Sequence, residues 1–600
     1  MIYRFAAEIA ECEVTGELDG WNVRFREEKI AEELSVVHLE LSAERDRNPP
    51  ETVFAFEVPQ RDAQVKWHPQ QELFDCHHYQ PRWWRGGREP FAFNRNVPVY
   101  SCMNLEGINS MSFACSETFR PVYCSCGPDE RSCIRTGLTL FSCAEEPCAF
   151  LHVAIRVDRR RIFYAEVLRE MVRWYDLMPE HSPVLPIPEV ARLPFYSSWY
   201  QYQKDVSRKE LEEELPYIKQ AGLRSVIIDD GWQCRGVEGG GSNMRSCGEW
   251  KPFPGKFPDL KALVEKFHAN GIRCLLWVAL PFVGVEQSAL LERFQGKFLP
   301  GGGDRKVFDP RFPEVRDWLT ASCCRLVREY QLDGLKLDFI DSIAPDAAGE
   351  TALRGRDTVS LMEGIERLLS GIRRTLTALN PDIIIEFRQH YTGPRMRKYG
   401  NVFRAADCAH DLLQNRMRTI DLRLLGGTSA IHSDMVIWSE YDTVQVAALQ
   451  ILNVLFSVPQ ISVRLSGESP EKRRMLAFWM RFCTEHRNVL QGGKLRPEHP
   501  ELSYPVVTAS GEDEAVTAVY QTGLPVRLRS DVRHIIVNAK HTEELLLDTD
   551  CACTVRLFDV FGDPAGERNL VPGINRLSVP CSGMAVCDRH HCRQELGSKF

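Results

Sequence analysis

The sequence predicts an α/β protein, a (β/α)8 TIM barrel flanked by an N-terminal β-sandwich and a small C-terminal β-sandwich. Short alternating apolar runs fill both ends of the chain, whereas apolar runs alternate with amphipathic helical segments in its middle. A proline-rich passage at 182–194 separates the first pattern from the second. The chain has 600 residues, enough for three domains, which we place at 1–182, 183–500 and 501–600.

The first domain is predicted from short runs separated by Pro, Gly and Asn clusters, a pattern typical of an antiparallel sandwich. The clearest runs are 36–41, 52–58, 138–141 and 150–155. The stretch 75–104 is rich in Trp, His, Arg and Pro and has no strand periodicity. We therefore expect long loops there, and loops carry functional residues more often than scaffold does.

The barrel is predicted because eight strand-like runs with intervening helices fit into about 270 residues. The predicted strands are 193–200, 225–232, 273–280, 334–341, 382–389, 402–408, 430–438 and 459–465. The predicted outer helices include 208–221, 259–270, 313–330 and 358–379. A doubly wound sheet also alternates strands and helices, but it normally has fewer strands and a Gly-rich first turn.

The C-terminal domain is predicted from a return to strand-like runs, at 516–520, 534–537, 553–557 and 575–579.

Charge and hydropathy argue against two classes of protein, nucleic-acid binders and membrane-spanning proteins. The formal charge is −8 and no long block carries one sign, which argues against nucleic-acid binding. No 18-residue apolar run exists to span a bilayer.

The start of the sequence has no basic segment leading into an apolar one and no A-x-A cleavage signal, so we expect a cytoplasmic protein. The 21 cysteines are an odd number, so at least one thiol stays unpaired, and in a reducing compartment free thiols are the default.

Two clusters contain residues that can bind metals. Cys124, Cys126 and Cys133 lack the paired CxxC spacing of a zinc ribbon. The other cluster lies near the C-terminus: Cys587, His590, His591 and Cys592. The sequence leaves open whether either cluster binds a metal. No H-x-H or H-E-x-x-H spacing supports a catalytic metal.

Polar residues follow several predicted barrel strands at their carboxyl ends, where the reacting groups of such a barrel lie. Lys336 and Asp338 share one face of their strand by period two, and an inward lysine beside an inward carboxylate is costly unless it is paired or used. Glu386 and Arg388 repeat this pattern on the next strand. Further polar residues at strand ends are Asp229, Asp230, Arg404, Asp407, His432 and Asp434.

Carboxylates at several strand ends, together with tryptophans, are typical of a sugar site. Carboxylates serve as nucleophile and acid, while aromatic faces pack on sugar rings. The candidate tryptophans are Trp199, Trp232, Trp277 and Trp438. Whether such a site retains or inverts the anomeric configuration depends on the separation of its two carboxyl groups, which the sequence does not give.

Five segments occur in an order that resembles glycoside hydrolase family 36 of clan D. They are SSWYQY (197–202), IDDGWQ (228–233), the segment 250–277, GLKLDFI (334–340) and FRAAD (403–407). The family contains α-galactosidases, α-N-acetylgalactosaminidases and raffinose-synthase-like proteins. The resemblance covers the barrel, about half of the chain, and the flanking sandwiches follow the family's domain order.

The resemblance implies a role for both candidate catalytic residues. Asp338 matches the aspartate of the K-x-D motif, the family's nucleophile, which forms a covalent glycosyl-enzyme. Asp407 matches the aspartate that ends R-x-S-D, the family's general acid/base, although Asp411 lies four residues farther on. Asp407 would protonate the leaving oxygen and later activate the incoming water or sugar hydroxyl.

The resemblance also implies a set of sugar-binding residues. Asp229 and Asp230 match paired acids that bind the 4- and 6-hydroxyls of a galacto-configured ring, and Lys336 matches a lysine that contacts neighbouring hydroxyls. Asp434 resembles an aspartate of the raffinose-synthase-like branch. The full set is Asp229, Asp230, Trp232, Lys336, Arg404, Arg388, Asp434 and Trp277.

Two segments depart from the family. WVALPF (277–282) replaces the usual bacterial W-x-E-P-E, and RQHYTG (388–393) replaces a glycine-rich turn. Both line the substrate site in the family, so the sugar's 2-substituent and the aglycone side stay open. The residues of the IDDGWQ and RAAD segments favour the raffinose-synthase-like branch, which includes transferases as well as hydrolases.

We therefore predict a retaining exo-α-glycosidase that hydrolyses terminal α-galactose-like residues by double displacement, of α-galactosidase or α-N-acetylgalactosaminidase type. Retaining glycosidase chemistry of this kind needs no cofactor. Its expected partner is a small oligosaccharide or glycoside, with neither nucleic acid nor membrane, and homo-oligomerisation is left open. The alternatives are an α-galactosyl transferase using the same two aspartates, a non-catalytic sugar-binding protein on a decayed barrel, and a barrel isomerase or aldolase with Lys336 as a Schiff base.

Overall fold

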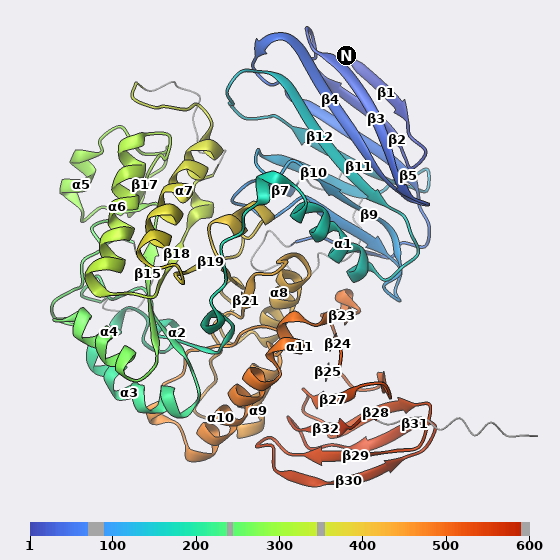
Figure 1. Ribbon diagram of the computed structural model, residues 1–600, viewed down its shortest axis with the longest axis vertical. Coiled ribbons are helices and arrows are strands. Elements are labelled where there is room, and N and C mark those ends of the chain that lie inside the picture. The colour runs from blue at the N-terminus through green and yellow to red at the C-terminus, as the bar shows by residue number, and fades with distance from the viewer. Residues whose placement is uncertain (70–88, 237–243, 345–353, 590–600) are drawn as a thin grey trace, which may run out of the picture.

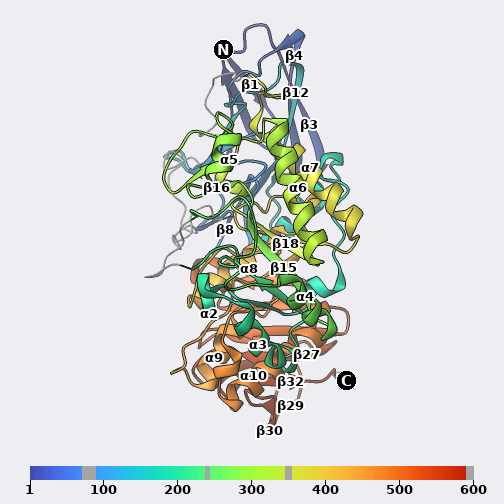
Figure 2. The same ribbon diagram turned by 90° about the vertical axis from the view of Figure 1, so that its left-hand side faces the viewer.

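The computed structural model describes residues 1–69, 89–236, 244–344 and 354–589. Two β-rich parts lie at opposite ends of the molecule's long axis (Figures 1 and 2), and in Figure 1 the outer helices of the barrel lie to the left of them. This arrangement confirms the predicted fold class, a (β/α)8 barrel between two β-sheet domains.

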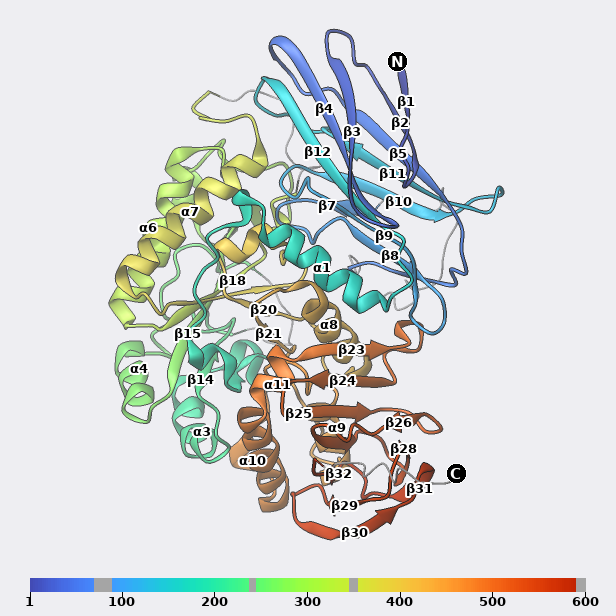
Figure 3. The same cartoon turned by 45° about the vertical axis from the view of Figure 1, so that its right-hand side comes forward.

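The N-terminal part is a sandwich of two six-stranded sheets, seen as separate layers in Figure 3. One sheet contains β1 (Ile2–Ala6), β2 (Glu11–Gly16), β5 (Thr52–Pro59), β11 (Cys133–Leu140), β10 (Val122–Pro128) and β7 (Glu89–Phe91), in that order. The other contains β3 (Asn22–Ala31), β4 (Leu34–Arg47), β12 (Cys148–Asp158), β9 (Asn109–Cys115), β8 (Val99–Met103) and β6 (Val65–Trp67). Alternate residues of β5 are buried, as period two requires.

The expectation of long loops across 75–104 is wrong for its second part. Strands β7 and β8 lie there, whereas 75–88 falls outside the described residues. All five residues of β8 are buried, so this strand shows no alternation of apolar and polar residues that a sequence pattern would reveal.

The barrel contains eight parallel strands, all within the predicted ranges. In spatial order they are β22 (Gln460–Ile461), β13 (Phe195–Ser197), β14 (Ser225–Ile228), β15 (Arg273–Ala279), β18 (Gly334–Asp338), β19 (Ile384–Arg388), β20 (Val402–Arg404) and β21 (Ala430–His432). Parallel bridges from His432 to Val458 and from Val436 to Ile461 bring the last strand against the first. The barrel is therefore nearly closed.

Helices α3, α4, α6 and α7 occupy the predicted outer-ring segments. The helices of this part are α2 (Trp199–Tyr202), α3 (Arg208–Gln220), α4 (Leu260–Ala269), α5 (Ser288–Arg293), α6 (Pro313–Tyr330), α7 (Leu361–Leu379), α8 (Leu412–Leu425), α9 (Val444–Leu452), α10 (Pro470–Glu485) and α11 (Arg487–Gly492). Helix α7 begins after the predicted start because Ser360 caps it, its side chain accepting from Glu363 N at 3.3 Å. A hairpin of β16 (Phe282–Gly284) and β17 (Arg305–Val307) follows β15.

The C-terminal part combines a seven-stranded and a three-stranded sheet. The larger contains β23 (Lys494–Glu498), β24 (Val506–Ser510), β25 (Glu514–Val519), β27 (Arg533–Asn538), β32 (Met584–Cys587), β29 (Cys553–Phe558) and β30 (Pro564–Leu570). The smaller contains β26 (Pro525–Arg527), β28 (Glu544–Thr549) and β31 (Gly573–Ser578). The first strand of the larger sheet, β23, lies before residue 501 and pairs with β24.

The candidate metal clusters gain no support from the described part of the chain, where no group of three or more His, Cys, Asp or Glu side chains could hold a metal ion. Cys124 and Cys126 are buried in the sandwich core. His590, His591 and Cys592 lie outside the described residues.

Eighteen described cysteines are free thiols, as expected, but Cys551 is disulfide-bonded, which corrects the expectation for that residue. Within the described ranges, no helix has both the length and the apolar character needed to cross a membrane.

One buried contact joins all three parts of the molecule. Trp67 of β6 donates its indole N–H to Asp421 Oδ1 on α8 at 3.1 Å and to Tyr504 OH, just before β24, at 2.9 Å. The Tyr504 hydroxyl also donates to Asp421 Oδ1 at 2.5 Å. Since all three side chains are buried, removing one donor leaves polar atoms without solvent to replace it.

We expect Trp67→Phe to lower the free energy of unfolding by about 2 kcal/mol more than a Trp→Phe change that loses only ring volume, because Asp421 loses a hydrogen bond. Trp479→Phe is the matched control. Trp479 is fully buried and its indole N–H has no hydrogen-bond partner in the described part of the chain. Denaturant unfolding of both variants measures the difference, and equal losses would contradict a stabilising junction at Trp67.

Candidate active site

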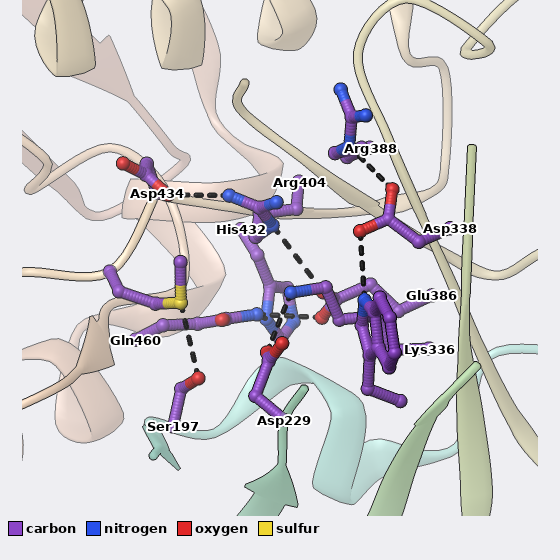
Figure 4. Close-up of polar contacts among 12 residues, drawn as sticks. Ser197, Asp229, Lys336, Asp338, Glu386, Arg388, Arg404, His432, Asp434 and Gln460 are labelled. Atoms are coloured by element: carbon purple, nitrogen blue, oxygen red, sulfur yellow. Dashed lines mark hydrogen bonds and ion pairs between the residues drawn. The ribbon is translucent and has the colours of Figure 1, made fainter. Parts of the chain in front are cut away.

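The carboxyl ends of neighbouring barrel strands bring the predicted polar residues together. In the parallel register Trp277 pairs with Lys336, Lys336 with Glu386, and Arg388 with Arg404. Because paired residues lie at the same level, their side chains form layers across the barrel. Figure 4 shows Asp229, Lys336, Glu386, Arg404 and Asp338 converging on one region.

Asp338 ends β18 and is 5% exposed. Its Oδ1 accepts from Arg388 Nε at 2.5 Å, from Tyr391 OH at 3.0 Å and from Phe339 N at 2.8 Å. Its Oδ2 accepts from Trp277 Nε1 at 3.0 Å. The structure thus brings three predicted residues, Asp338, Arg388 and Trp277, into direct contact.

The charge of Asp338 is compensated within the barrel. Burial alone would raise the pKa of this carboxyl, but Arg388, Lys336 and Arg404 outweigh burial and hold the pKa below its usual range. Asp338 is therefore an ionised carboxylate at neutral pH, the form that a nucleophile needs.

Lys336 is bound to Asp229, its Nζ lying 2.7 Å from Oδ2 of that carboxylate. Burial opposes the positive charge, but Asp229, Asp338 and Glu386 raise the pKa of Lys336 above its ordinary value. A Schiff-base lysine needs a neutral amine, which a lysine reaches when desolvated away from acids. The geometry therefore argues against the isomerase or aldolase alternative.

Asp230 lies next to Asp229 in the turn after β14. Its Oδ1 accepts from Gln233 Nε2 at 2.7 Å, and Lys204 Nζ lies 3.3 Å from Oδ2. Burial raises the pKa of Asp230. Trp232 is fully buried and donates its indole N–H to Trp277 O at 2.9 Å, so it supports Trp277.

Arg404 gathers three acids around one buried guanidinium. It forms ion pairs with Asp434, with Asp407 Oδ1 at 2.8 Å and with Glu386 Oε1 at 3.5 Å. Burial lowers the pKa of Arg404, but these acids more than offset it and raise the pKa. Arg404 therefore links strands β19, β20 and β21 at the carboxyl end of the barrel.

Asp407 and Asp338 differ in exposure. The side chain of Asp407 is 54% exposed, whereas that of Asp338 is 8% exposed. Burial would raise the pKa of Asp407, but Arg404, Arg388 and Lys336 lower it below its ordinary value. Asp411 caps α8, its side chain accepting from Gln414 N at 3.0 Å, which is a structural role.

Asp434 is fully buried and tied to its surroundings by all its polar atoms. Besides the ion pair with Arg404, its Oδ2 accepts from Tyr200 OH at 2.7 Å and from Cys408 N at 2.6 Å. The side chain of Asn415 accepts from the backbone N of Asp434 and donates to its backbone O. Asp434 thus holds the guanidinium of Arg404 and the backbone of Cys408, the residue directly after Asp407.

Several residues of this network were not singled out as site residues from the sequence. Glu386 was placed on the inward face, but its buried partner Gln460, which donates to Oε2 at 2.6 Å, comes from another strand. The others are Tyr200, Lys204, Gln233, Tyr391 and Asn415. Tyr200 and Gln233 lie inside the SSWYQY and IDDGWQ segments, and Tyr391 lies inside the RQHYTG departure, so the segments themselves are the available signal.

The remaining candidates have structural contacts. His432 is buried, with Nε2 2.7 Å from Ala191 O and Nδ1 3.1 Å from Gln460 Nε2, contacts that give it a structural role. Trp438 is buried and donates to Glu468 Oε1 at 2.9 Å, and Trp199 is half-buried.

No protein-family model matches this chain. It is 28% identical over 223 residues to alpha-galactosidase 2 of Pediococcus pentosaceus, an alignment that covers 35% of this chain and 28% of that protein. The aligned part is thus well under two thirds of the relative's length.

Solved structures match almost the whole chain. A variant of the family 36 α-galactosidase AgaA from Geobacillus stearothermophilus, in complex with 1-deoxygalactonojirimycin, superposes with a TM-score of 0.65 at 13% identity, covering 98% of this chain and 86% of that one. Other AgaA variants were solved with stachyose and with raffinose. A family 31 sulfoquinovosidase from E. rectale has a TM-score of 0.59 at 12% identity and covers 98% and 89% of the two chains. The fold is that of family 36 α-galactosidases, as the motifs predict.

Glu386 provides a pH-dependent test of the buried network. Burial raises the pKa of Glu386 to about 7. A carboxyl group that binds its proton more tightly in the folded state stabilises the fold at low pH, and this contribution is lost as the pH rises through 7. We expect the unfolding temperature of the wild type, relative to that of Glu386→Gln, to fall between pH 5 and pH 8. A difference that stays constant over this range would contradict the raised pKa.

Proposed function

We propose that the chain is a member of glycoside hydrolase family 36 and a retaining exo-α-glycosidase that acts on terminal α-galactose-like residues. The observation that carries the proposal is the state of Asp338. It is a buried, ionised carboxylate at the end of the fourth barrel strand, and Arg404 lies close enough to influence both it and the more exposed Asp407. The motif order and the fold of the α-galactosidases support the same assignment.

In the proposed first step, Asp338 attacks the anomeric carbon and the glycosidic C–O bond breaks. Asp407 gives a proton to the leaving oxygen, and the sugar stays bound to Asp338 as an ester. In the second step, a water loses its proton to Asp407 and attacks the same carbon, which releases Asp338 as a carboxylate. Two inversions at one carbon give net retention.

In the free site Arg404, Arg388 and Lys336 hold the pKa of Asp407 below its ordinary value, so the proposed acid step requires this pKa to rise when the substrate binds. The negative charge of Asp338 raises the pKa of Asp407, whereas Arg404 lowers it. Once Asp338 is esterified its charge is gone, so the pKa of Asp407 falls and the base form is favoured in the second step. A residue that serves first as acid and then as base requires this change.

The proposed sugar-binding groups lie beside the nucleophile. Asp229 is held by Lys336 and by Ser198 Oγ, which lies 2.9 Å from its backbone N. Asp230 Oδ2 lies 3.3 Å from Lys204 Nζ, and this ion pair leaves a further lone pair of Oδ2 for a sugar hydroxyl. The AgaA complexes with stachyose and raffinose support small α-galactoside oligosaccharides as the substrate class. Cytoplasmic placement stays a prediction.

A transferase would use the same two aspartates and differ only in the second acceptor, a sugar hydroxyl in place of water. The departures at 277–282 and 388–393 lie around Asp338, where Trp277, Arg388 and Tyr391 contact it directly. A non-catalytic binding protein fits less well, since both candidate carboxylates are present and paired with basic groups.

We expect hydrolysis of a p-nitrophenyl α-galactoside or α-N-acetylgalactosaminide, measured beside α-glucoside and β-galactoside, with and without a sugar acceptor. Asp338→Ala removes the nucleophile and should reduce activity to background. Asp407→Asn should slow the reaction by about 10²–10⁴-fold on poor leaving groups and much less on activated ones.

Asp411→Asn is the matched control for Asp407→Asn, because Asn also caps a helix and Asp411 touches no proposed reacting group. It should retain wild-type activity. Product formed only when an acceptor sugar is present would favour the transferase, and silence on every substrate would favour the binding protein.

A further inference from the structure

The two carboxylate oxygens of Asp338 have unequal hydrogen bonding. Within the described residues, Oδ1 accepts from Arg388 Nε at 2.5 Å and from Phe339 N at 2.8 Å. It also lies 3.0 Å from Tyr391 OH, whose one hydrogen can reach Leu337 O at 3.1 Å as well. Oδ2 accepts from one donor, Trp277 Nε1, at 3.0 Å. Figure 4 shows Arg388 approaching Asp338 from the side away from Lys336.

A carboxylate offers about four lone-pair sites, two on each oxygen. The two N–H donors therefore occupy both lone pairs of Oδ1, and the Tyr391 hydroxyl adds a third contact, whereas one donor leaves a lone pair of Oδ2 available. Only an oxygen with an available lone pair can form a new bond to carbon without first losing a hydrogen bond.

We propose that Oδ2 is the oxygen of Asp338 that attacks the anomeric carbon, and that Arg388 and Tyr391 are positioning residues that hold Oδ1 and so aim Oδ2. This inference rests on the proposed function. Both residues belong to the segment 388–393 that departs from the family pattern.

The bond changes balance with this assignment. A lone pair of Oδ2 forms the new C–O bond, the glycosidic C–O bond breaks, and the proton from Asp407 goes to the leaving oxygen. Oδ1 becomes the carbonyl oxygen of the ester and still accepts from Phe339 N–H and the Tyr391 hydroxyl. Trp277 N–H stays on the second lone pair of Oδ2.

The two positioning side chains are themselves held from several directions. Tyr391 is fully buried, its backbone N bonds Arg388 O at 3.2 Å, and its ring lies 5.6 Å from that of Phe387. The guanidinium of Arg388 lies 5.0 Å from the centre of the Phe339 ring. Such packing fixes rotamers, which a positioning role requires.

The N-terminal sandwich also holds the segments that carry these donors. Asn94 donates to Ile340 O at 2.8 Å and to Ile343 O at 3.0 Å, in the segment that follows Asp338. Asn96 N donates to His390 O at 2.7 Å, next to Tyr391. One turn of the sandwich therefore holds both segments that supply donors to Oδ1.

The direct test is a crystal structure of the enzyme reacted with 5-fluoro-α-galactosyl fluoride, which forms a slowly hydrolysed glycosyl-enzyme. We expect the sugar to be bonded to Oδ2, on the Trp277 side, with Oδ1 still accepting from Phe339 N and Tyr391 OH. A bond to Oδ1 would overturn the inference and leave the proposed function intact. A sugar on another residue, or none, would refute the proposed function and this inference with it.

A kinetic test separates positioning from packing. We expect Tyr391→Phe to slow glycosyl-enzyme formation by about 10- to 100-fold, since a hydrogen bond to a charged group is lost, with little change in KM. Tyr399→Phe is the matched control, because Tyr399 is buried and its hydroxyl donates to the carboxylate of Glu366 at 2.8 Å, outside the site. The control should keep the wild-type rate, and a wild-type rate in Tyr391→Phe would overturn its positioning role.

Discussion

The compensation of buried charge is the constraint on which this site depends. An uncompensated carboxylate inside a protein costs several kcal/mol and normally becomes neutral. Here Asp338, Asp229 and Asp434 stay close to Arg388, Lys336 and Arg404. Lys336 and Arg404 are buried and Arg388 is mostly so, and removing one member of a pair therefore leaves an uncompensated charge.

The acids of the site differ in pKa because their surroundings differ. Asp338 is kept ionised by the basic groups around it, whereas burial raises the pKa of Glu386 to about 7. Asp407 is more exposed and responds to both Asp338 and Arg404. One cluster therefore holds a fixed anion beside a group whose protonation depends on the charge of that anion. Double-displacement chemistry needs this combination.

The flanking domains contribute to the site as well as to the packing of the three parts. The sandwich turn with Asn94 and Asn96 touches the segments after β18 and β19. Trp67 meets Asp421 and Tyr504 where all three parts of the chain join. The match of 98% of the chain to the AgaA structure, at 13% identity, shows that this three-part fold persists while most residues change.

The sequence by itself determined where the barrel strands lie, because short apolar runs such as 226–228 and 383–385 are followed directly by charged residues, and local periodicity suffices to find them. It also placed Lys336 and Asp338 on one face. Only the tertiary structure decided that Tyr391 and Trp277 bind opposite oxygens of Asp338, and that Gln460 bonds Glu386. These contacts join strands far apart in the chain, and they depend on register and on barrel closure, which no local pattern encodes.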